Sequence, residues 1–394
     1  MTSAAADNRL SRIGVVGGGQ LARMLVDASR QRNVEVIVQT PSLADPAAQI
    51  AADVIEADPV DADATQALLK RCSSITFENE WVSIEALTAL ERKGARFRPS
   101  LASLKPLVNK LHQRQLLDRL SIPSPDWVEL ISIDPGAPSL PKGWSFPVMA
   151  KAVTGGYDGR GTRVLKTIDC LAELLRSVDP DDWILEAWVD YESELALVVS
   201  RDQSGRVRAL PLAQTHQSNQ VCDWVFAPAD VEQLVEATAY NIAASLLTTL
   251  DYVGVMAIEM FYGSKGLLVN EIAPRTHNSG HFSIEACHSS QFDQQLCIAA
   301  GLDIPDPVLK VPGALMVNLL GLPADQATSL DQRLSALRAE PSLNLHWYDK
   351  QGESPGRKLG HVTVVLDGED ASTRWRQAMD ALQRVRSIWP LPLN

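Results

Sequence analysis

The chain has 394 residues, with 36 Lys and Arg against 48 Asp and Glu, and a formal net charge of −12. This length suggests two or three domains, whose core is large enough to need no disulfide or metal for stability. The acidic balance argues against general binding to nucleic acid or to an anionic membrane, although a local basic patch can still hold an anionic small molecule.

The sequence shows no sign of a membrane span or of a secretory signal. No apolar run approaches the roughly 18 residues of a span, and the first residues, MTSAAADNRLSR, lack the apolar core of a signal peptide. Five scattered cysteines without a CxxC pair are typical of reduced thiols and give no zinc site. We therefore expect a cytoplasmic protein.

The first forty residues predict a strand, a glycine turn, a helix and a second strand. Residues 13–16 and 34–38 are apolar, and residues 20–30 between them have apolar side chains at helical spacing. The turn between strand and helix fits GxGxxA, in which a helix N-terminus approaches a phosphate. A dinucleotide site also needs an acid at the end of the second strand, where Gln39 and Thr40 stand. A phosphate-binding or structural turn is therefore preferred.

Further along, the patterns predict a strand at residues 74–78, a boundary at residues 99–106 and a helix over residues 107–120. Strands are then expected at residues 148–153 and 163–166. Later elements are expected at residues 169–176 (helix), 183–189, 194–200 and 206–211 (strands), 230–249 (helix), and 253–262 and 267–272 (strands). Prolines at 305, 307 and 312 mark a second boundary, beyond which a small mixed domain has a helix near residues 325–339.

A glycine-rich loop, TGGYDGRG at residues 154–161, is the strongest single signal. Its backbone N–H groups can wrap a polyphosphate. Because strands flank it on both sides, it is not a P-loop and instead resembles a flap over nucleotide phosphates, with Lys151 as a nearby point charge. A flexible surface hairpin is the alternative, which Tyr157, Asp158 and Arg160 within the loop disfavour.

Two acids stand in the strands that flank Ser264-Lys265-Gly266. If these three residues form the loop, Gly263 opposes Leu267 and Glu259 opposes Glu271. Facing carboxylates repel unless a cation lies between them, and oxygen ligands beside phosphates suit Mg²⁺. A two- or four-residue loop would instead pair Glu259 with Asn270, and two solvated acids on an exposed hairpin are a further alternative.

Polar side chains follow the second of these strands. Arg275 has the fork that binds an oxyanion, and His277 and Asn278 are placed to orient a small anion. Further upstream, the strand ending Glu186-Ala187-Trp188-Val189 is a weak candidate for reading an adenine edge, with Glu194 for a ribose.

The C-terminal region carries a basic patch in an otherwise acidic protein. Lys350, Arg357 and Lys358 lie within nine residues of one another. Such a patch is suited to a substrate phosphate, and a solvated loop is the alternative.

Taken together, these motifs resemble the N5-carboxyaminoimidazole ribonucleotide synthetase family of ATP-grasp enzymes, from about Arg12 to near Val365. The resemblance is carried by GGGQLARM, TFENE, AVTGGYDGRGT, EAWV, GVMAIEMF, NEIAPRTHNSGH and HWYDKQGESPGRKLGH. It departs at Ala22, where the family usually has Gly, and over the last 25 or so residues. At the position where the family often has an ATP-contacting His, ungapped alignment places Gln217, with His216 beside it.

The resemblance implies an α/β (overall α+β) ATP-grasp fold: a Rossmann-like domain at residues 1–107, an ATP-grasp domain at 108–310 and a small mixed domain at 311–394. It implies ATP- and bicarbonate-dependent carboxylation of 5-aminoimidazole ribonucleotide through carboxyphosphate, with Mg²⁺, in a homodimer. The implied ATP contacts are Lys110, Lys151, Gly156, Tyr157, Asp158, Gly159, Arg160, Gly161, Thr162, Glu186, Ala187, Trp188, Val189, Glu194, Gln217, Asn270 and Glu271. The implied ribonucleotide contacts are Glu78, Tyr157, Asp158, Arg160, Lys350 and Arg357. The implied catalytic residues are Arg275, His277, Asn278, Glu259 and Glu271, the last two also as metal ligands.

Three rival functions remain at this point. Another ATP-grasp ligase acting on a different acceptor is disfavoured by the pair Lys350 and Arg357, which suits a ribonucleotide phosphate. A non-catalytic nucleotide sensor is disfavoured because Glu259 and Glu271 are both present. A nicotinamide oxidoreductase is disfavoured by the missing acid after the second strand.

Overall fold

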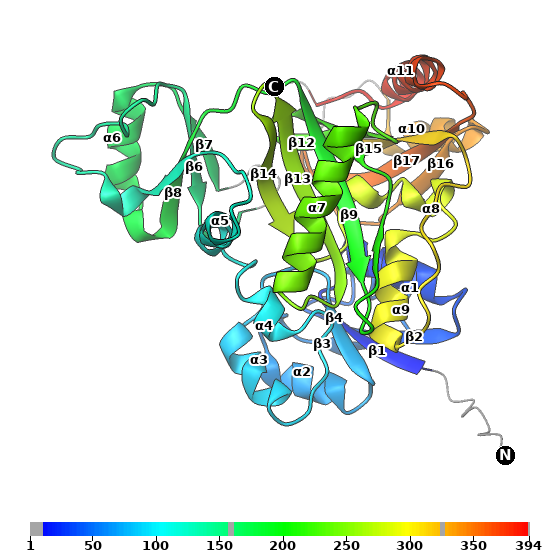
Figure 1. The fold of residues 1–394 in the computed structure, drawn as a ribbon. Helices are drawn as coiled ribbons and strands as arrows, with labels where there is room; N and C mark the ends of the chain where they lie inside the picture. Colours follow the sequence, from blue (N-terminus) through cyan, green and yellow to red (C-terminus); the bar gives the residue numbers. More distant parts are fainter. Residues whose placement is uncertain (1–10, 157–160, 324–327, 393–394) are drawn as a thin grey trace.

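The computed structural model describes residues 11–156, 161–323 and 328–392. Its N-terminal lobe is built on a parallel sheet. Its strands are β1 (Ser11–Val16), β2 (Val34–Thr40), β3 (Asp53–Glu56) and β4 (Ser74–Phe77), in the order β3-β2-β1-β4. Its helices are α1 (Gln20–Ser29), α2 (Ala62–Leu69), α3 (Ile84–Glu91) and α4 (Leu101–Leu104). The predicted strand, turn, helix and strand at the N-terminus are confirmed (Figure 1).

A second, small lobe stands apart at the left of Figure 1. It is an antiparallel sheet of β5 (Trp127–Glu129), β8 (Trp183–Ala187), β6 (Val148–Ala152) and β7 (Thr162–Leu165), in that order. The helix α6 (Ile168–Ser177) covers one face by burying Leu171 and Leu174 against β6 and β8. The helix α5 (Lys110–Arg119) leads into this lobe, and short 3-10 turns lie at η1 (Leu130–Ser132) and η2 (Pro180–Asp182).

The centre of the molecule is a sheet that spans the rest of the described chain. Its strands are β9 (Ser193–Arg201), β10 (Val207–Ala209), β11 (Ala213–Ser218), β12 (Val221–Ala227), β13 (Gly254–Gly263), β14 (Gly266–Ala273), β15 (Gly313–Leu320), β16 (Asn344–Trp347) and β17 (Lys358–Leu366). Their order is β14-β13-β9-β11-β12-β15-β17-β16, with β10 beside β9. The C-terminal strands therefore extend the central sheet, through pairing of β12 with β15.

Helices pack on this sheet and join it to the N-terminal lobe. They are α7 (Gln233–Thr249), η3 (Asn278–Gly280), α8 (Ser283–Ala286), α9 (Gln291–Ala300), α10 (Leu330–Ala339) and α11 (Ala371–Ile388). Phe292 and Leu296 of α9 are buried in one cluster with Leu21 and Leu25 of α1. The two lobes thus share a core, which fixes the glycine turn relative to the central sheet.

Three predicted boundaries move. The helix expected from residue 107 begins at Lys110, because Asn109 is extended and its side chain accepts from the N–H of His112. The strand expected to reach Val189 ends at Ala187, because its partner β6 begins opposite that residue. The helix expected near residues 325–339 begins at Leu330, and residues 324–327 lie outside the described chain. No pattern predicted α11.

The hairpin of β13 and β14 corrects the predicted loop but keeps its consequence. Gly263 pairs with Gly266, so the loop is the two residues Ser264 and Lys265, not three. A bulge then inserts Asn270 as an extra residue, which restores the pairing of Glu259 with Glu271. The carboxylates face each other for a different reason from the one the loop pattern suggested.

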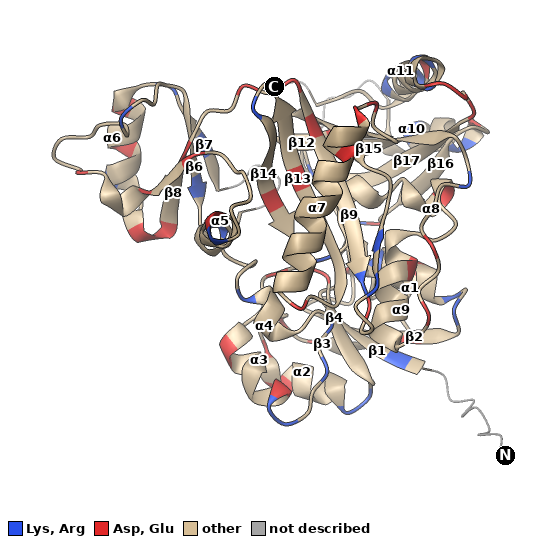
Figure 2. Cartoon of the chain, in the orientation of Figure 1, with Lys and Arg blue, Asp and Glu red and all other residues tan. Residues whose placement is uncertain are grey.

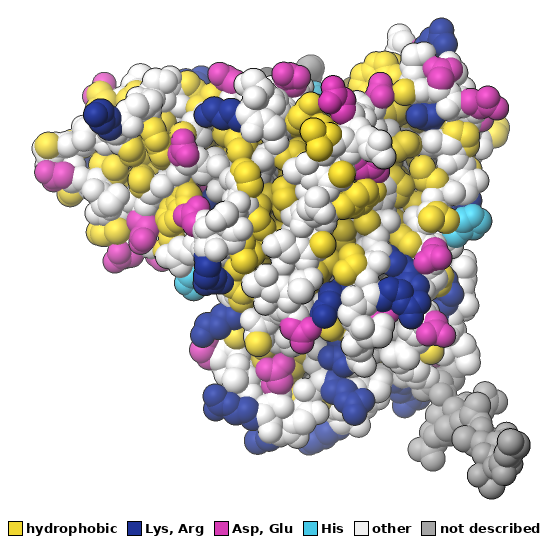
Figure 3. All heavy atoms as spheres, viewed as in Figure 1, with side chains coloured by type: hydrophobic (Ala, Val, Ile, Leu, Met, Phe, Trp, Pro, Cys, Tyr) yellow, Lys and Arg dark blue, Asp and Glu magenta, His cyan; other side chains and the backbone are white. Residues whose placement is uncertain are grey.

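The surface and the composition add two observations. In the view of Figure 3, basic side chains gather over the N-terminal lobe, although the chain as a whole is acidic. No helix in the described ranges is both long and apolar enough to cross a bilayer.

Candidate active site

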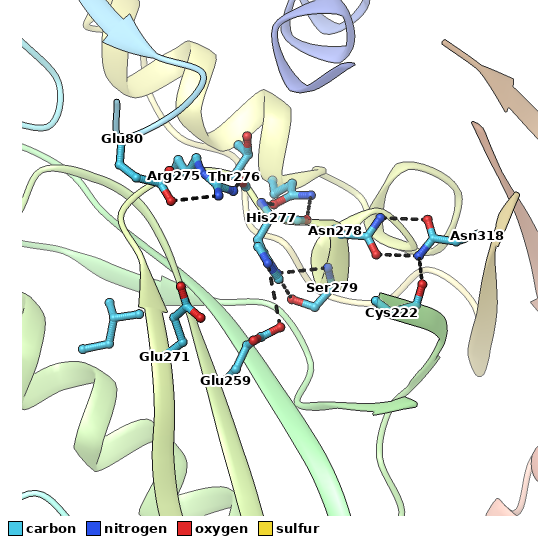
Figure 4. A network of polar contacts seen from close by, with 12 residues as sticks. Glu80, Cys222, Glu259, Glu271, Arg275, Thr276, His277, Asn278, Ser279 and Asn318 are labelled. Carbon is cyan, nitrogen blue, oxygen red and sulfur yellow. Dashed lines mark hydrogen bonds and ion pairs between the residues drawn. The ribbon is translucent and has the colours of Figure 1, made fainter. Parts of the chain in front are cut away.

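The two acids of the β13–β14 hairpin form the centre of the candidate site (Figure 4). Burial and the neighbouring Glu271 raise the pKa of Glu259 to about 7. Burial alone would also raise the pKa of Glu271, but the ammonium of Lys110, with its Nζ 2.6 Å from Oε1, brings it down to about 2. Lys110 thus neutralises the charge of Glu271. Glu259, with its raised pKa, would lose its proton when a cation binds.

A second lysine faces the bulge from the small lobe. Lys151 of β6 donates to Oδ1 of Asn270 at 2.9 Å and lies 2.8 Å from Oε2 of Glu186. Glu186 also accepts from Arg114, at 2.7 and 2.8 Å, and all three groups are buried. Burial lowers the pKa of Lys151 below its ordinary value, although the charge of Glu186 acts in the opposite direction. Figure 2 shows acidic segments on β13 and β14 and a basic segment on β6.

The donors present suit a magnesium ion held partly by phosphates. Mg²⁺ in nucleotide sites takes one or two carboxylates and completes its shell with phosphate oxygens and water. Glu259 and Glu271 offer two carboxylates on paired residues. In the described residues, no group of three or more His, Cys, Asp or Glu is arranged to hold a metal by itself. The site therefore fits a metal that arrives with a nucleotide.

The residues expected at the nucleotide end lie between the two sheets. Ala187 ends β8, and Trp188 beyond it is exposed. Glu194 of β9 accepts from the hydroxyl of Tyr191 at 2.6 Å and also from Gln217. Burial raises the pKa of Glu194. Thr215 pairs with Glu194, and side chains alternate along a strand, so Gln217 lies on the face of Glu194 whereas His216 points to the other face and stacks on Trp224.

The ends of the glycine-rich loop come together between β6 and β7. The carbonyl of Gly161 accepts from the N–H of Ala152 at 2.8 Å, and a Cβ added to Gly161 would lie 3.2 Å from the Cα of Gly156. Gly161 has a φ of +76°, which favours glycine. Thr162 starts β7 opposite Lys151. The expected contacts Tyr157, Asp158, Gly159 and Arg160 lie outside the described residues.

The guanidinium of Arg275 is already engaged by an acid of the N-terminal lobe. Its Nε and Nη2 donate to the two oxygens of Glu80, at 2.6 and 3.2 Å. Burial would lower the pKa of Arg275, but Glu80 raises it above its ordinary value. Two of its nitrogens are therefore already bonded to Glu80, and the third, Nη1, donates to the carbonyl of Thr276 at 3.2 Å.

The two residues expected beside Arg275 point in different directions in Figure 4. His277 lies toward the carboxylates, with Nε2 3.8 Å from Oε1 of Glu259 and Nδ1 3.0 Å from the hydroxyl of Ser279. Asn278 is buried and exchanges two amide hydrogen bonds with Asn318, at 2.9 and 2.7 Å. The structure brings His277 toward Glu259, whereas the amide of Asn278 joins η3 to β15.

At the other end of the site, Glu78 lies under the glycine turn. A Cβ on Gly19 would collide with its carboxylate, and Oε1 accepts from the N–H of Leu21 at 3.4 Å. Burial raises the pKa of Glu78, and the charges of Arg275 and Lys350 lower it. The carboxylate of Glu78 thus takes the place that a dinucleotide phosphate would need at this turn. Glu78 also interacts with both Arg275 and Lys350.

The basic patch is only partly assembled. Lys350 donates to Oε1 of Gln20 at the start of α1 and to the carbonyl of Lys358 at 2.7 Å. Its ammonium lies 5.5 Å from the ring centre of Tyr348, a cation–π distance. Arg357, in contrast, is exposed and donates to the carbonyl of Gln351.

Two contributors were missed by the sequence interpretation. Arg114 is buried beside Glu186, and Glu80 forms an ion pair with Arg275. Arg114 follows Lys110 by four residues, one helical turn, which was an available signal. Glu80 is the last residue of the TFENE motif, but nothing local indicated its partner, which is 195 residues away.

Comparison with known proteins places the chain among nucleotide-dependent synthetases. Three family models match: the ribonucleotide synthetase preATP-grasp domain at residues 10–106, the ATP-grasp domain at 115–292 and the phosphoribosylaminoimidazole carboxylase C-terminal domain at 314–374. An N5-carboxyaminoimidazole ribonucleotide synthase of Synechococcus elongatus is 46% identical over 392 residues, covering 99% of this chain and 98% of that one. One of Synechocystis is 40% identical, covering 97% and 99%.

Solved structures agree with these relatives. A carboxyaminoimidazole ribonucleotide synthase of Aspergillus clavatus complexed with ATP is 30% identical, with a TM-score of 0.84, covering 95% of this chain and 99% of that one. The Aspergillus clavatus structure in complex with ADP and 5-aminoimidazole ribonucleotide is 29% identical, with a TM-score of 0.82 and the same coverage. The similarity to these two structures therefore extends over 95% of the chain.

Proposed function

Because the chain belongs to the N5-carboxyaminoimidazole ribonucleotide synthase family of ATP-grasp ligases, we propose how its residues divide the work of that reaction. The function is ATP-dependent carboxylation of 5-aminoimidazole ribonucleotide in purine biosynthesis. The observation that carries the proposal is the carboxylate pair Glu259 and Glu271 with Lys110 and Lys151 beside it.

The first step is phosphoryl transfer from ATP to bicarbonate. A bicarbonate oxygen bonds to the γ-phosphorus, and the bridging oxygen leaves with ADP, which gives carboxyphosphate. Such transfers depend on positioning and charge neutralisation rather than on a nucleophilic side chain. Lys110 and Lys151 place their ammonium groups beside the neighbouring residues Glu271 and Asn270 of β14 and supply that positive charge.

Glu259 and Glu271 would hold Mg²⁺ together with the phosphates. When bound, the ion neutralises phosphate charge and supports in-line geometry. Lys110 keeps Glu271 ionised for this role. Glu259, whose pKa is raised, would lose its proton when the cation binds.

The second step transfers the carboxyl group to the exocyclic amine of the ribonucleotide. The amine nitrogen bonds to the carboxyl carbon of carboxyphosphate or of CO₂ released from it, phosphate leaves and the amine loses a proton. We assign stabilisation of the oxyanion to Arg275 and His277, with Asn278 fixing the backbone between them and β15. Carboxyphosphate reacts with water, so closure of the loop at residues 154–161 protects it.

The ribonucleotide occupies the end of the site that contains Glu78 and Lys350. Lys350 is the first phosphate contact, and Arg357 reaches the same phosphate from its exposed loop. Tyr157, Asp158 and Arg160 of the glycine-rich loop are assigned to the same substrate by the family resemblance. Asn270 and Glu186 hold Lys151 for ATP. Glu194 with Gln217 holds the ribose of ATP, and residues 187–189 hold its adenine.

The deciding experiment measures ADP release from Mg·ATP and bicarbonate, with and without 5-aminoimidazole ribonucleotide. We expect strong dependence on the ribonucleotide and an acid-labile carboxylated product. ADP release that is indifferent to the ribonucleotide would instead point to another acceptor on the same fold.

A variant tests the residue assignment. Glu271→Ala should abolish ADP formation, because it removes both a metal ligand and the partner of Lys110, and circular dichroism should show an intact fold. Glu236→Ala, in an acid of the outer helix α7, is the matched control and should keep full turnover. Unchanged turnover in Glu271→Ala would remove the metal assignment.

We also propose that the protein is cytoplasmic and works as a homodimer. Light scattering on the purified protein should give twice the mass of the chain. A monomer that retains full activity would contradict the assembly.

A further inference from the structure

A tyrosine in the loop that joins β8 to β9 is bonded to the acid assigned to the ribose of ATP. The hydroxyl of Tyr191 donates to Oε1 of Glu194 at 2.6 Å. Its ring stacks on that of Phe261 in β13, with centroids 4.7 Å apart and planes at 17°. Burial and the bond to Glu194 raise the pKa of Tyr191, so the hydroxyl keeps its proton and remains a donor.

The pairing of β9 with β13 places this contact on the face of the central sheet that carries Glu259. Glu194 pairs with Phe261, and Glu259 precedes Phe261 by two residues in β13. Side chains alternate along a strand and paired residues share a face, so all three point to the same side. Besides burial and Glu271, the charge of Glu194 raises the pKa of Glu259, because the two carboxylates are close. Tyr191 therefore lies at the candidate site, on the same side of the sheet.

The loop keeps its place without the tyrosine hydroxyl. The backbone N–H of Glu192 donates to the carbonyl of Tyr262 at 2.8 Å. The loop also packs closely on the end of β13, where a Cβ added to Gly263 would lie 3.2 Å from the Cα of Tyr191. Tyr191 is 44% exposed, so water can replace the partner of its hydroxyl at little cost in stability. The bond to Glu194 therefore has its main consequence for the acid and not for the loop.

The carboxylate of Glu194 can bind protein donors and ribose hydroxyls at the same time. An ionised carboxylate accepts about four hydrogen bonds, and Tyr191 and Gln217 supply two. Both donors are neutral, so they orient the carboxylate without cancelling its charge. Burial raises the pKa of Glu194, and the bonds from Tyr191 and Gln217 act in the opposite direction, which favours the ionised form that accepts hydrogen bonds. The two adjacent hydroxyls of a ribose match the remaining acceptor positions.

We propose that Tyr191 is a positioning residue for ATP, which holds Glu194 in the orientation that accepts the ribose hydroxyls and so favours ATP over deoxynucleotides. Its hydroxyl binds the acid and its ring binds Phe261, so one side chain joins Glu194 to β13. A carboxylate that is oriented before ATP arrives loses less conformational freedom on binding. The proposal rests on the proposed assignment of Glu194 to the ribose.

The test compares ATP with dideoxy-ATP, which lacks both ribose hydroxyls, in the unmodified enzyme and in Tyr191→Phe. The variant keeps the ring on Phe261 but removes the bond to Glu194. We expect the KM for ATP to rise about fivefold, the effect of one hydrogen bond, and the KM for dideoxy-ATP to change less than about twofold. A loss of folding or of loop packing would instead raise both constants. Equal rises for both nucleotides, or an unchanged KM for ATP, would overturn the proposal.

A matched control is available in the outer helix α7. Tyr240 also donates its hydroxyl to a glutamate, Glu236, at 2.9 Å. Tyr240→Phe removes the same kind of bond away from the site and should leave both KM values unchanged.

Variants of the acid separate this proposal from the ribose assignment. Glu194→Ala should raise the KM for ATP toward that for dideoxy-ATP, and adding Tyr191→Phe to it should cause no further change. Fully additive effects would contradict action through Glu194. If Glu194→Ala leaves the difference between the two nucleotides unchanged, the ribose assignment fails and the proposal fails with it. If Glu194→Ala abolishes this difference but Tyr191→Phe does not reduce it, the proposal alone fails.

Discussion

At the scale of single residues, Glu259 couples nucleotide binding to pH. Its pKa lies at about 7 because it is buried beside Glu271. Binding of Mg²⁺ requires the ionised form, so binding removes a proton and the affinity rises as the pH increases through 7. We expect release of about half a proton at pH 7, from calorimetry of Mg²⁺ with a non-hydrolysable ATP analogue in two buffers of different ionisation enthalpy. Heats that are identical after correction for dilution would contradict this assignment.

Lys350 gives a residue-scale prediction for the other substrate. Its ammonium is held by Gln20, by the carbonyl of Lys358 and by the ring of Tyr348. Lys350→Ala removes one charge-assisted hydrogen bond to a phosphate, so the KM for the ribonucleotide should rise roughly ten- to hundredfold. The KM for ATP should change little, and Lys310→Ala, in an exposed lysine, is the control. Equal effects on both KM values would exclude the phosphate role.

At the scale of elements, local patterns located most segments near the site but not their exact ends. The glycine turn, the strand before the glycine-rich loop and the two strands with Glu259 and Glu271 were predicted from apolar runs and glycines. The bulge at Asn270 was not, because a bulge depends on pairing between strands rather than on local preference. The ion pair of Arg275 with Glu80 was not predicted for the same reason, since Glu80 comes from another lobe.

The start of α5 shows how an element end sets a functional side chain. Asn109 caps the helix by accepting from the N–H of His112 at 3.1 Å, and the next residue, Lys110, reaches Glu271. Asn109→Ala should lower the free energy of unfolding by about 1 kcal/mol and raise the KM for ATP, because the first turn that carries Lys110 frays. Asn109→Ser keeps a cap and should restore both values in denaturant titration and kinetics. A rise in KM that Asn109→Ser also shows would mean that the side chain acts by direct contact.

At the scale of the whole molecule, the joining of lobes was beyond the sequence patterns. The C-terminal segment was predicted to be a small mixed domain, and a C-terminal family domain does match residues 314–374. Its strands also continue the central sheet, which no pattern predicted. That arrangement depends on pairing of β12 with β15, across about ninety residues of chain. It brings the basic patch at Lys350 to the start of α1 and Asn318 to Asn278. The site is therefore complete only when all parts have folded together.

This joint core predicts how the protein responds to acid. His281 and His361 are fully buried, their ring centroids are 4.8 Å apart, and burial depresses the pKa of both well below the ordinary value. In the unfolded chain each histidine titrates near 6.5. The unfolded state therefore binds more protons below that pH, and stability is full above about 6.5 and falls as the pH decreases.

Each buried histidine should remove up to about 1.4 kcal/mol of unfolding free energy per pH unit below 6.5. Chemical denaturation between pH 7.5 and 5 measures this slope. His361→Gln cannot titrate there, so its slope should be shallower by one proton even if the variant is less stable at pH 7.5, because it also loses the bond from His361 to Tyr348. His288→Gln, in an exposed histidine, should keep the original slope. A slope unchanged in His361→Gln would show that acid sensitivity arises elsewhere, such as from the carboxylates that are paired in the site.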